Sequence, residues 1–331
     1  MDRSAAASYE ATFGPGIVFA GAIEDWLRTQ TMPEDIDVVV GGPPCQGFST
    51  LGKQDEEDLR NDLWRRYAET IVRVKPKYFV VENVAAFEKS TQFQQFVDAT
   101  RPGGFLEDYA FRHRVLNAAD FGAPQARKRA VLIGHRRDLP FPGFPQPTHT
   151  ARVDTSLYRH IRVRDALLGV PGEPDGDVVL GSRSMEFAGR VLAGPFTTRE
   201  LHWSRDYSAL SLRRFEAIPP GGNRFDINEE DLAPCWRRHK AGSGDVMGRL
   251  HLDRPSVTIR TEFFKPEKGR YLHPTMNRAI THYEAALLQG FRPDHKFVGS
   301  KTAIARQIGN AVPIPLGAAI GRQLAGALEG L

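Results

Sequence analysis

Short apolar runs alternate with longer periodic stretches over the first 135 residues of the chain. Residues 38–40 and 78–81 are runs of valine, tyrosine and phenylalanine, which predict two short buried strands. Between them, residues 61–73 place an apolar side chain at every fourth position, which predicts a helix. Residues 109–116 and 129–135 predict a further pair of strands. Strands that alternate with helices indicate a wound α/β sheet.

The pattern changes after about residue 140. Residues 141–149 are rich in proline and cannot form regular structure, so they are interpreted as a linker. Residues 150–255 are irregular and carry scattered cations. Order returns where Thr281 and Glu284 form a capping box that opens a helix, and a last helix follows Pro313. The scattered cations are Arg205, Arg213, Arg214, Arg224, Arg237, Arg238 and Lys240.

Composition narrows the class of protein without identifying it. The 331 residues are 41% hydrophobic and 25% charged, as in an ordinary globular protein of one large or two modest domains. The net charge of +4, from 44 Lys and Arg against 40 Asp and Glu, is compatible with a nucleic-acid partner but does not demand one. Only two cysteines, no long apolar stretch and no signal peptide predict a cytoplasmic protein with no membrane span.

Cys45 stands out because of its position. It follows the apolar run 38–40 at the carboxyl end of a predicted strand, where open α/β sheets place their active sites. The neighbouring Pro43, Pro44 and Gly47 fix and expose the loop, which favours a nucleophile over a packing thiol. Cys235 has no such setting, so we expect it to be a small packing residue.

Five motifs then occur along the chain in a fixed order. They are GPPCQGFS around Cys45, Glu82-Asn83-Val84, QARKR at residues 125–129, RPSVTIR at residues 254–260 and QIGNAVP at residues 307–313. Their sequence and order resemble the C5-cytosine DNA methyltransferases over nearly the whole chain.

The resemblance implies a particular fold and domain organisation. It implies a class I, Rossmann-like α/β sheet of the S-adenosylmethionine-dependent methyltransferases, truncated at its N-terminus, with a small irregular target-recognition domain. Residues 1–148 would form the catalytic α/β domain without its first βα unit. Residues 149–255 would form the target-recognition domain, and residues 256–331 would return to the catalytic domain.

The resemblance also implies roles for four catalytic residues and no metal ion. A Cys45 thiolate would add to C6 of a cytosine flipped out of the DNA duplex, so that C5 attacks the methyl group of S-adenosylmethionine. Glu82 would supply a proton or hydrogen bond at N3 of the base. Arg129, with Arg127, would hold the base's O2 and the geometry around Glu82.

Further residues are implied for the cofactor and the DNA. The implied cofactor-binding residues are Ile23, Pro44, Leu63 and Asn310. The implied DNA-binding residues are Gln46, Ser49, Lys53 and Arg60, next to or within a mobile loop that closes over the DNA. The cations of residues 150–255 would contact phosphates, and which of them read base edges stays open.

One expected part of the family pattern is missing. The family normally begins with a strand that leads into a Phe-x-Gly-x-Gly loop for the cofactor, followed by an acidic residue for its ribose. Residues 19–22 imitate that loop but match a later Gly-Asp-Ile segment, in which Ala22 replaces the acid and Glu24 or Asp25 are substitutes. A longer reading frame, a complementing N-terminal polypeptide or a degenerate remnant would each explain this, and the intact catalytic motifs favour the first. We expect this chain alone to bind cofactor poorly.

The leading functional hypothesis is a DNA (cytosine-5-)-methyltransferase acting on double-stranded DNA in a restriction-modification system. A catalytically impaired DNA-binding remnant or subunit, which needs a separate N-terminal chain, is the alternative from another class. An RNA cytosine methyltransferase is disfavoured, because residues 149–255 leave ample room for reading a duplex.

Overall fold

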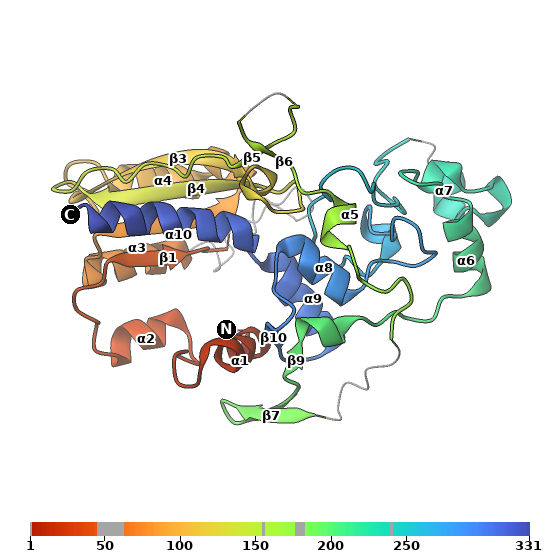
Figure 1. Ribbon diagram of the computed structural model, residues 1–331. Coiled ribbons are helices and arrows are strands. Elements are labelled where there is room, and N and C mark those ends of the chain that lie inside the picture. The colour runs from red at the N-terminus through yellow and green to blue at the C-terminus, as the bar shows by residue number, and fades with distance from the viewer. Residues whose placement is uncertain (1, 45–62, 154–155, 176–182, 239–240) are drawn as a thin grey trace. The chain divides into compact units, whose positions relative to one another are not determined.

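The computed structural model describes residues 2–44, 63–153, 156–175, 183–238 and 241–331 (Figure 1). Contacts divide the chain into two compact units. Unit 1 comprises residues 1–20, 122–127 and 149–315, and unit 2 comprises residues 21–121, 128–148 and 316–331. Both units are therefore built from segments far apart in sequence. The division into catalytic and recognition domains is a functional one and stays a prediction.

Unit 2 contains the central sheet. Its helices are α2 (Ile23–Thr29), α3 (Leu63–Val74), α4 (Thr91–Ala99), most of α10 (Ile314–Glu329) and the 3-10 helices η3 (Ala85–Lys89) and η4 (Ala118–Phe121). Its strands are β1 (Val38–Gly41), β2 (Tyr78–Val84), β3 (Tyr109–Asn117) and β4 (Lys128–Arg136). These strands form a sheet in the order β1-β2-β4-β3, in which β1 and β2 are parallel and the other pairs are antiparallel. The predicted α/β class is confirmed, with a mixed sheet at its centre.

The predicted strand at residues 38–40 is present as β1, but the prediction that it is buried was wrong. Val38 and Val39 are half-buried, and the side chain of Val40 is 69% exposed. The reason is its place in the sheet: among the described strands, β1 pairs only with β2 and forms an edge. An apolar run alone does not distinguish a central strand from an edge strand.

Helices cover the sheet through the periodic apolar positions that the sequence shows. The helix predicted at residues 61–73 is α3, and it buries Tyr67 and Ile71 against β2 and α4 in one hydrophobic cluster. Phe79 and Phe96 belong to the same cluster and meet edge to face, with ring centroids 5.7 Å apart. Figure 1 shows α10 running alongside the strands, and α10 buries Leu316, Ile320 and Leu324, which lie on the face that its sequence pattern predicts.

The proline-rich segment after β4 is irregular, as predicted, but it is not a free linker. Phe144 is buried, and the guanidinium carbon of Arg114 lies 5.0 Å from its ring centroid. The side-chain amide of Gln323 in α10 donates to the carbonyl oxygen of Pro142 over 2.5 Å. Residues 142–145 therefore belong to the packed part of unit 2. Prolines prevent regular structure here without preventing burial.

Unit 1 is made of short elements around separate clusters. Its helices are α1 (Arg3–Phe13), α5 (Val163–Ala166), α6 (Ala209–Glu216), α7 (Pro234–Arg238), α8 (His282–Gln289), α9 (Lys301–Asn310) and the 3-10 helices η5 (Thr198–Leu201), η6 (Arg224–Asp226), η7 (Glu229–Asp231) and η8 (Pro266–Lys268). Its strands are β5 (His149–Thr150), β6 (Tyr158–Arg159), β7 (Ser184–Phe187), β8 (Arg190–Ala193), β9 (Phe196–Thr197) and β10 (Lys296–Phe297). The predicted capping box is confirmed at the start of α8. Thr281 N donates to Glu284 Oε2 over 2.8 Å, and Glu284 N donates to Thr281 Oγ1 over 3.1 Å.

One buried arginine organises the irregular part of unit 1. The guanidinium of Arg249 donates to the main-chain oxygens of Phe215, Ile218, His273 and Met276 over 2.6 to 2.9 Å. Burial lowers the pKa of Arg249, yet an arginine remains charged at neutral pH. Its side chain thus connects residues 215–218 with residues 273–276, which lie on either side of the predicted domain boundary at position 255. Little regular structure connects these segments otherwise.

No helix in the described ranges is long and apolar enough to cross a membrane.

Candidate active site

The loop that carries Cys45 leaves the sheet beside Glu82. Strands β1 and β2 are parallel with Gly41 opposite Val81, so Gly42 and Glu82 follow at the same end of the pair. A Cβ atom on Gly42 would lie 3.6 Å from Glu82 Oε2. This proximity follows from the sequence, because neighbouring parallel strands bring their carboxyl ends to one edge.

Two residues that sequence reasoning missed fix the start of this loop. Asn83 Nδ2 donates to the carbonyl oxygen of Pro43 over 2.9 Å. The Tyr67 hydroxyl lies 3.1 Å from Val39 O and 2.8 Å from Val80 O, so it bridges β1 and β2. Burial raises the pKa of Tyr67, which therefore stays a neutral hydroxyl. For Asn83, the available sequence signal was a polar residue soon after the apolar run 78–81. For Tyr67, helical spacing indicated only a core residue.

The packing of the Tyr67 ring also requires a glycine at position 41. A Cβ atom on Gly41 would lie 2.4 Å from Tyr67 Cε2, a distance that no side chain could accept without movement of the ring. The glycine that ends β1 thus lets the ring of Tyr67 pack against the end of the strand.

Glu82 and Arg129 form an ion pair across two antiparallel strands. Arg129 in β4 is opposite Val84 in β2, two positions beyond Glu82 on the same face. Arg129 Nε lies 2.8 Å from Glu82 Oε1, and the side chains are 12% and 18% exposed, respectively. Burial lowers the pKa of Arg129, and the Glu82 carboxylate opposes that shift. The guanidinium holds the Glu82 carboxyl group in place, and that group, once it has taken up a proton from solvent, can donate a hydrogen bond or the proton to a ring nitrogen.

Arg127 has a different environment from Arg129. It is 4% exposed and belongs to unit 1. Its two terminal nitrogens donate to Ile259 O over 2.8 Å and to Gly309 O over 3.0 Å. The structure therefore gives Arg127 a main-chain anchoring role, and its contact with the base stays a prediction.

The motif that contains Arg127 meets the last two motifs in unit 1. Gln125 Oε1 accepts from Ile259 N over 2.9 Å, and Arg127 bonds the carbonyl of the same residue. A Cβ atom on Gly309 would lie 2.5 Å from the carbonyl carbon of Arg260, so the helix of the last motif approaches this backbone closely. Three motifs separated by up to about 180 residues in sequence thus form one packed group.

The predicted nucleophile and the predicted DNA-binding residues lie outside the described residues. These are Cys45, Gln46, Ser49, Lys53 and Arg60.

The four predicted cofactor-binding residues are divided between the two units. Ile23 begins α2, Leu63 begins α3, and Pro44 is the last described residue before position 45, all in unit 2. Asn310 ends α9 in unit 1. Their roles remain predictions.

The acids considered as substitutes at the start of α2 already have cationic partners. Ala22 is the N-cap residue of α2 and makes no side-chain capping bond. Asp25 pairs with Arg28 at 2.8 Å, and Glu24 lies 3.4 Å from Arg66 of α3. These acids serve α2 and its contact with α3, which weakens the case that either replaces the missing acid.

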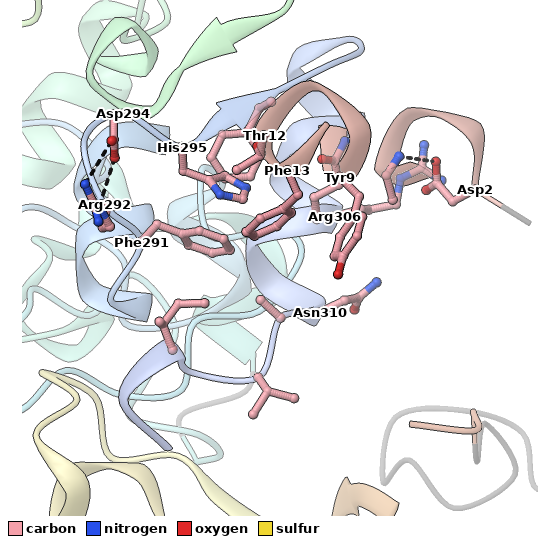
Figure 2. A pocket seen from close by; sticks show the side chains of 16 residues that line it. Asp2, Tyr9, Thr12, Phe13, Phe291, Arg292, Asp294, His295, Arg306 and Asn310 are labelled. Atoms are coloured by element: carbon pink, nitrogen blue, oxygen red, sulfur yellow. Dashed lines mark hydrogen bonds and ion pairs between the residues drawn. The ribbon is translucent and has the colours of Figure 1, made fainter. Parts of the chain in front are cut away.

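A cavity of about 860 Å³ lies beside Asn310 within unit 1 (Figure 2). Tyr9 and Phe13 of α1 contribute two rings with centroids 4.7 Å apart, and Phe291 and His295 contribute two more at 4.8 Å. Figure 2 shows these rings gathered together with Asn310 close by. Its volume is in the range of small-molecule sites, and aromatic walls with an amide suit a flat heterocycle with polar edges. The residues present therefore fit an adenosyl group.

Residues 200–238 overturn one expectation and show what some of the scattered cations contact. Cys235 is exposed on α7, whose residues are all at least partly accessible, so the expectation of a packing thiol was wrong. Arg224, one of the scattered cations, is buried and donates to Ala241 O over 2.8 Å. Arg213 pairs with Asp231 at 2.9 Å. Some of these cations therefore maintain the local fold.

Comparisons with known proteins agree with one another. A family model described as C-5 cytosine-specific DNA methylase matches residues 1–326. The type II methyltransferase M.XorII of Xanthomonas oryzae is 36% identical over 317 residues, covering 89% of this chain and 69% of that protein. M1.HphI of Haemophilus parahaemolyticus, also a type II methyltransferase, is 36% identical over 302 residues, covering 90% and 70%.

A solved structure gives the same fold. It is that of an E. coli prophage-encoded protein described as a DNA modification methyltransferase, with a TM-score of 0.67 at 22% identity, covering 99% of this chain and 91% of the other. The family model spans almost the whole sequence, and the chain belongs to the C-5 cytosine-specific DNA methylase family.

Proposed function

We propose that this protein is a DNA (cytosine-5-)-methyltransferase that modifies double-stranded DNA within a restriction-modification system. The observation that carries the proposal is the Glu82–Arg129 ion pair at the sheet edge where the Cys45 loop leaves β1. The names of the relatives M.XorII and M1.HphI, both type II methyltransferases, support the same conclusion. A cytoplasmic location accords with a chain that has two cysteines.

Cys45 is the proposed nucleophile. C5 of cytosine is a weak nucleophile, and addition of a thiolate to C6 forms a C–S bond that pushes the ring electrons toward C5 and N3. Only the thiolate form reacts, so the loop must lower the pKa of Cys45 or supply a base. After methylation, loss of the C5 proton expels the thiolate and restores the aromatic ring.

Glu82 and Arg129 are proposed to act at N3 and O2 of the base, where the displaced electrons accumulate. Glu82 provides a proton or a hydrogen bond where negative charge develops at N3. Arg129 fixes the orientation of Glu82 through the 2.8 Å ion pair and adds positive charge near O2 of the base. Arg127 supports the site indirectly by anchoring the motif that precedes β4.

The proposed cofactor is S-adenosylmethionine, which supplies an electrophilic methyl group. Asn310 and the aromatic rings beside it would hold its adenosyl part, and Ile23, Pro44 and Leu63 are the further proposed contacts. The proposed DNA contacts are Gln46, Ser49, Lys53 and Arg60. Binding through such contacts weakens steeply with rising salt, because phosphate neutralisation releases counterions.

Covalent trapping tests the proposed chemistry. DNA that carries 5-fluorocytosine is incubated with the protein and S-adenosylmethionine. After methyl transfer, C5 carries fluorine in place of a proton, so the thiolate cannot be expelled and the enzyme remains covalently bound. We expect a denaturation-resistant adduct with the unaltered protein and with Cys235→Ser, and none with Cys45→Ser. An adduct formed by Cys45→Ser, or one lost in Cys235→Ser, would contradict the assignment.

Calorimetry with S-adenosylhomocysteine tests the cofactor assignment separately. Asn310→Ala should weaken binding by about 1 kcal/mol, the contribution of one hydrogen bond, whereas Asn228→Ala on an exposed turn should not.

A further inference from the structure

A second cavity in unit 1, separate from every residue discussed so far for catalysis or cofactor binding, is walled by aromatic rings. Its volume is about 210 Å³. Trp203, Tyr207, Phe264 and His282 line it, and they come from three segments of the chain. This is smaller than the roughly 300 Å³ at which pockets for drug-sized ligands begin, and it suits one flat ring system.

The rings form a partial stack. The His282 ring is stacked on Phe264, at an interplanar angle of 20° and a centroid distance of 5.6 Å. Trp203 also packs on His282, with ring centroids 5.0 Å apart and planes tilted by 46°. Flat surfaces of this kind attract other flat π-systems.

Two cations line the same cavity. Lys301 Nζ lies 5.1 Å from the ring centroid of Trp203, and the guanidinium carbon of Arg205 lies 5.1 Å from that of Tyr207. No carboxylate is among the described residues that line the cavity. Lys265 also lies over the ring of Phe264, but it differs from Lys301 and Arg205 because it pairs with Glu262 at 2.5 Å. Two cations and no described carboxylate therefore line the cavity.

His282 contributes a fixed hydrogen-bond acceptor. It is only 3% exposed, and its Nε2 lies 2.9 Å from the carbonyl oxygen of Lys301. A carbonyl can only accept, so Nε2 carries the proton and Nδ1 is the bare acceptor. Among the described residues, the indole Nε1 of Trp203, which lines the same cavity, is buried and has no hydrogen-bond partner. Burial lowers the pKa of His282 to about 4, so the ring stays neutral at pH 7.

We propose that this cavity binds the base of an unpaired nucleotide, with its phosphate against Arg205 and Lys301. Aromatic walls alone would also suit a quaternary ammonium group, but the two cations would repel it. Stacking rings combined with cations are what proteins use to bind unstacked bases. An N–H of the base would donate to His282 Nδ1. The inference rests on the proposed function, since the nucleotide would belong to the DNA substrate and be distinct from the methylated cytosine.

The test compares two DNA duplexes that differ only at one unpaired residue. One carries an extra nucleotide with its base, and the other carries an abasic residue at the same place. Stacking of one base contributes about 1–3 kcal/mol, so the full-length protein should bind the first duplex about tenfold more tightly in fluorescence anisotropy. Lys301→Met and Arg205→Met should weaken that preference, and Phe264→Leu should reduce it most. Arg190→Met, on exposed strand β8, is the matched control and should keep it.

A second arm separates the two sources of a nucleotide. Free deoxynucleoside monophosphates are titrated while tryptophan fluorescence is followed in unaltered protein and in Trp203→Phe. Quenching by free nucleotides as tight as binding of the bulged duplex would overturn the DNA source. Equal affinity for the two duplexes in unaltered protein, with Cys45 trapping intact, would overturn the pocket itself. Loss of trapping with the base preference preserved would instead overturn the proposed function.

Discussion

Arg127 and Arg129 are two positions apart, yet their guanidinium groups have different partners. Arg129 pairs with Glu82 at 2.8 Å, whereas Arg127 donates to the main-chain oxygens of Ile259 and Gly309. One therefore serves the candidate catalytic carboxylate, and the other serves the packing of distant motifs. This difference predicts separable effects of substitution.

Arg127→Met should destabilise the fold. It would leave two main-chain oxygens without their charged donor, and each such loss costs about 1–3 kcal/mol. We expect the free energy of unfolding in urea to fall by about 3 kcal/mol. Lys128→Met, at the exposed neighbouring position, should change it by less than about 0.5 kcal/mol. Equal stability of the two variants would contradict the anchoring role of Arg127.

Glu82→Gln should impair catalysis more than binding. The amide keeps the shape of the side chain but loses the proton and the charge, and general acid–base groups contribute about 10²–10⁴-fold to rate. We expect kcat to fall by at least about 100-fold, while the Kd for duplex DNA changes by less than about threefold. Glu88→Gln, on the 3-10 helix that follows β2, is the control. If weaker binding of duplex DNA accounted for the whole loss of activity, Glu82 would be assigned to DNA binding instead.

The stability of unit 1 should decrease in acid. Burial lowers the pKa of both His273 and His282 to about 4, from an ordinary value of 6.5. The unfolded chain therefore binds protons first, so the stabilisation is complete above pH 6.5 and is lost as pH falls through about 4. Burial opposes ionisation of Glu284, but hydrogen bonds from Arg278 still hold the pKa of Glu284 below its usual value. Protonation of Glu284 at low pH therefore also reduces the stability of the folded state.

Urea denaturation between pH 7.5 and 4.5 measures this dependence. Each histidine can account for up to about 3 kcal/mol over the full range. His282→Gln should flatten the curve, whereas His113→Gln on the exposed part of β3 should not. A curve of unchanged slope in His282→Gln would show that this histidine does not couple folding to pH.

Sequence patterns predicted those features that depend on local spacing. The helix α3, the strands of the sheet and the capping box at Thr281 follow from periodicity and from residues three positions apart. The proximity of the Cys45 loop to Glu82 also follows, because it depends only on two neighbouring parallel strands. Motif order identified the family in the same way, since a motif is itself local.

The remaining features depend on contacts between distant segments, which periodicity does not encode. Val40 is exposed because β1 lies at the edge of the described sheet, and Pro142 and Phe144 are buried where Gln323 and Arg114 pack on them. The partners of Arg127 lie more than 130 positions away. Nothing near such a residue in sequence shows whether it faces solvent, a base or a carbonyl oxygen.

Exchange of the recognition region should succeed only with the right boundary. Arg249 bonds Phe215 and Ile218 within residues 149–255, but it also bonds His273 and Met276 beyond them. A chimera of residues 149–255 from a relative of known specificity would leave these acceptors facing a foreign partner. We expect it to lose several kcal/mol of stability, since a broken network around a buried cation is costly. A chimera of residues 149–290 keeps within one parent both the Arg249 network and the buried Arg278–Glu284 pair, whose atoms lie 2.7 Å apart. It should be more stable than the 149–255 chimera and methylate the donor's sequence. Denaturation in urea and mapping of methylated cytosines measure the two properties. A 149–255 chimera as stable as the parent would show that Arg249 does not set the boundary, and a 149–290 chimera with the parent's specificity would show that the sequence is read elsewhere.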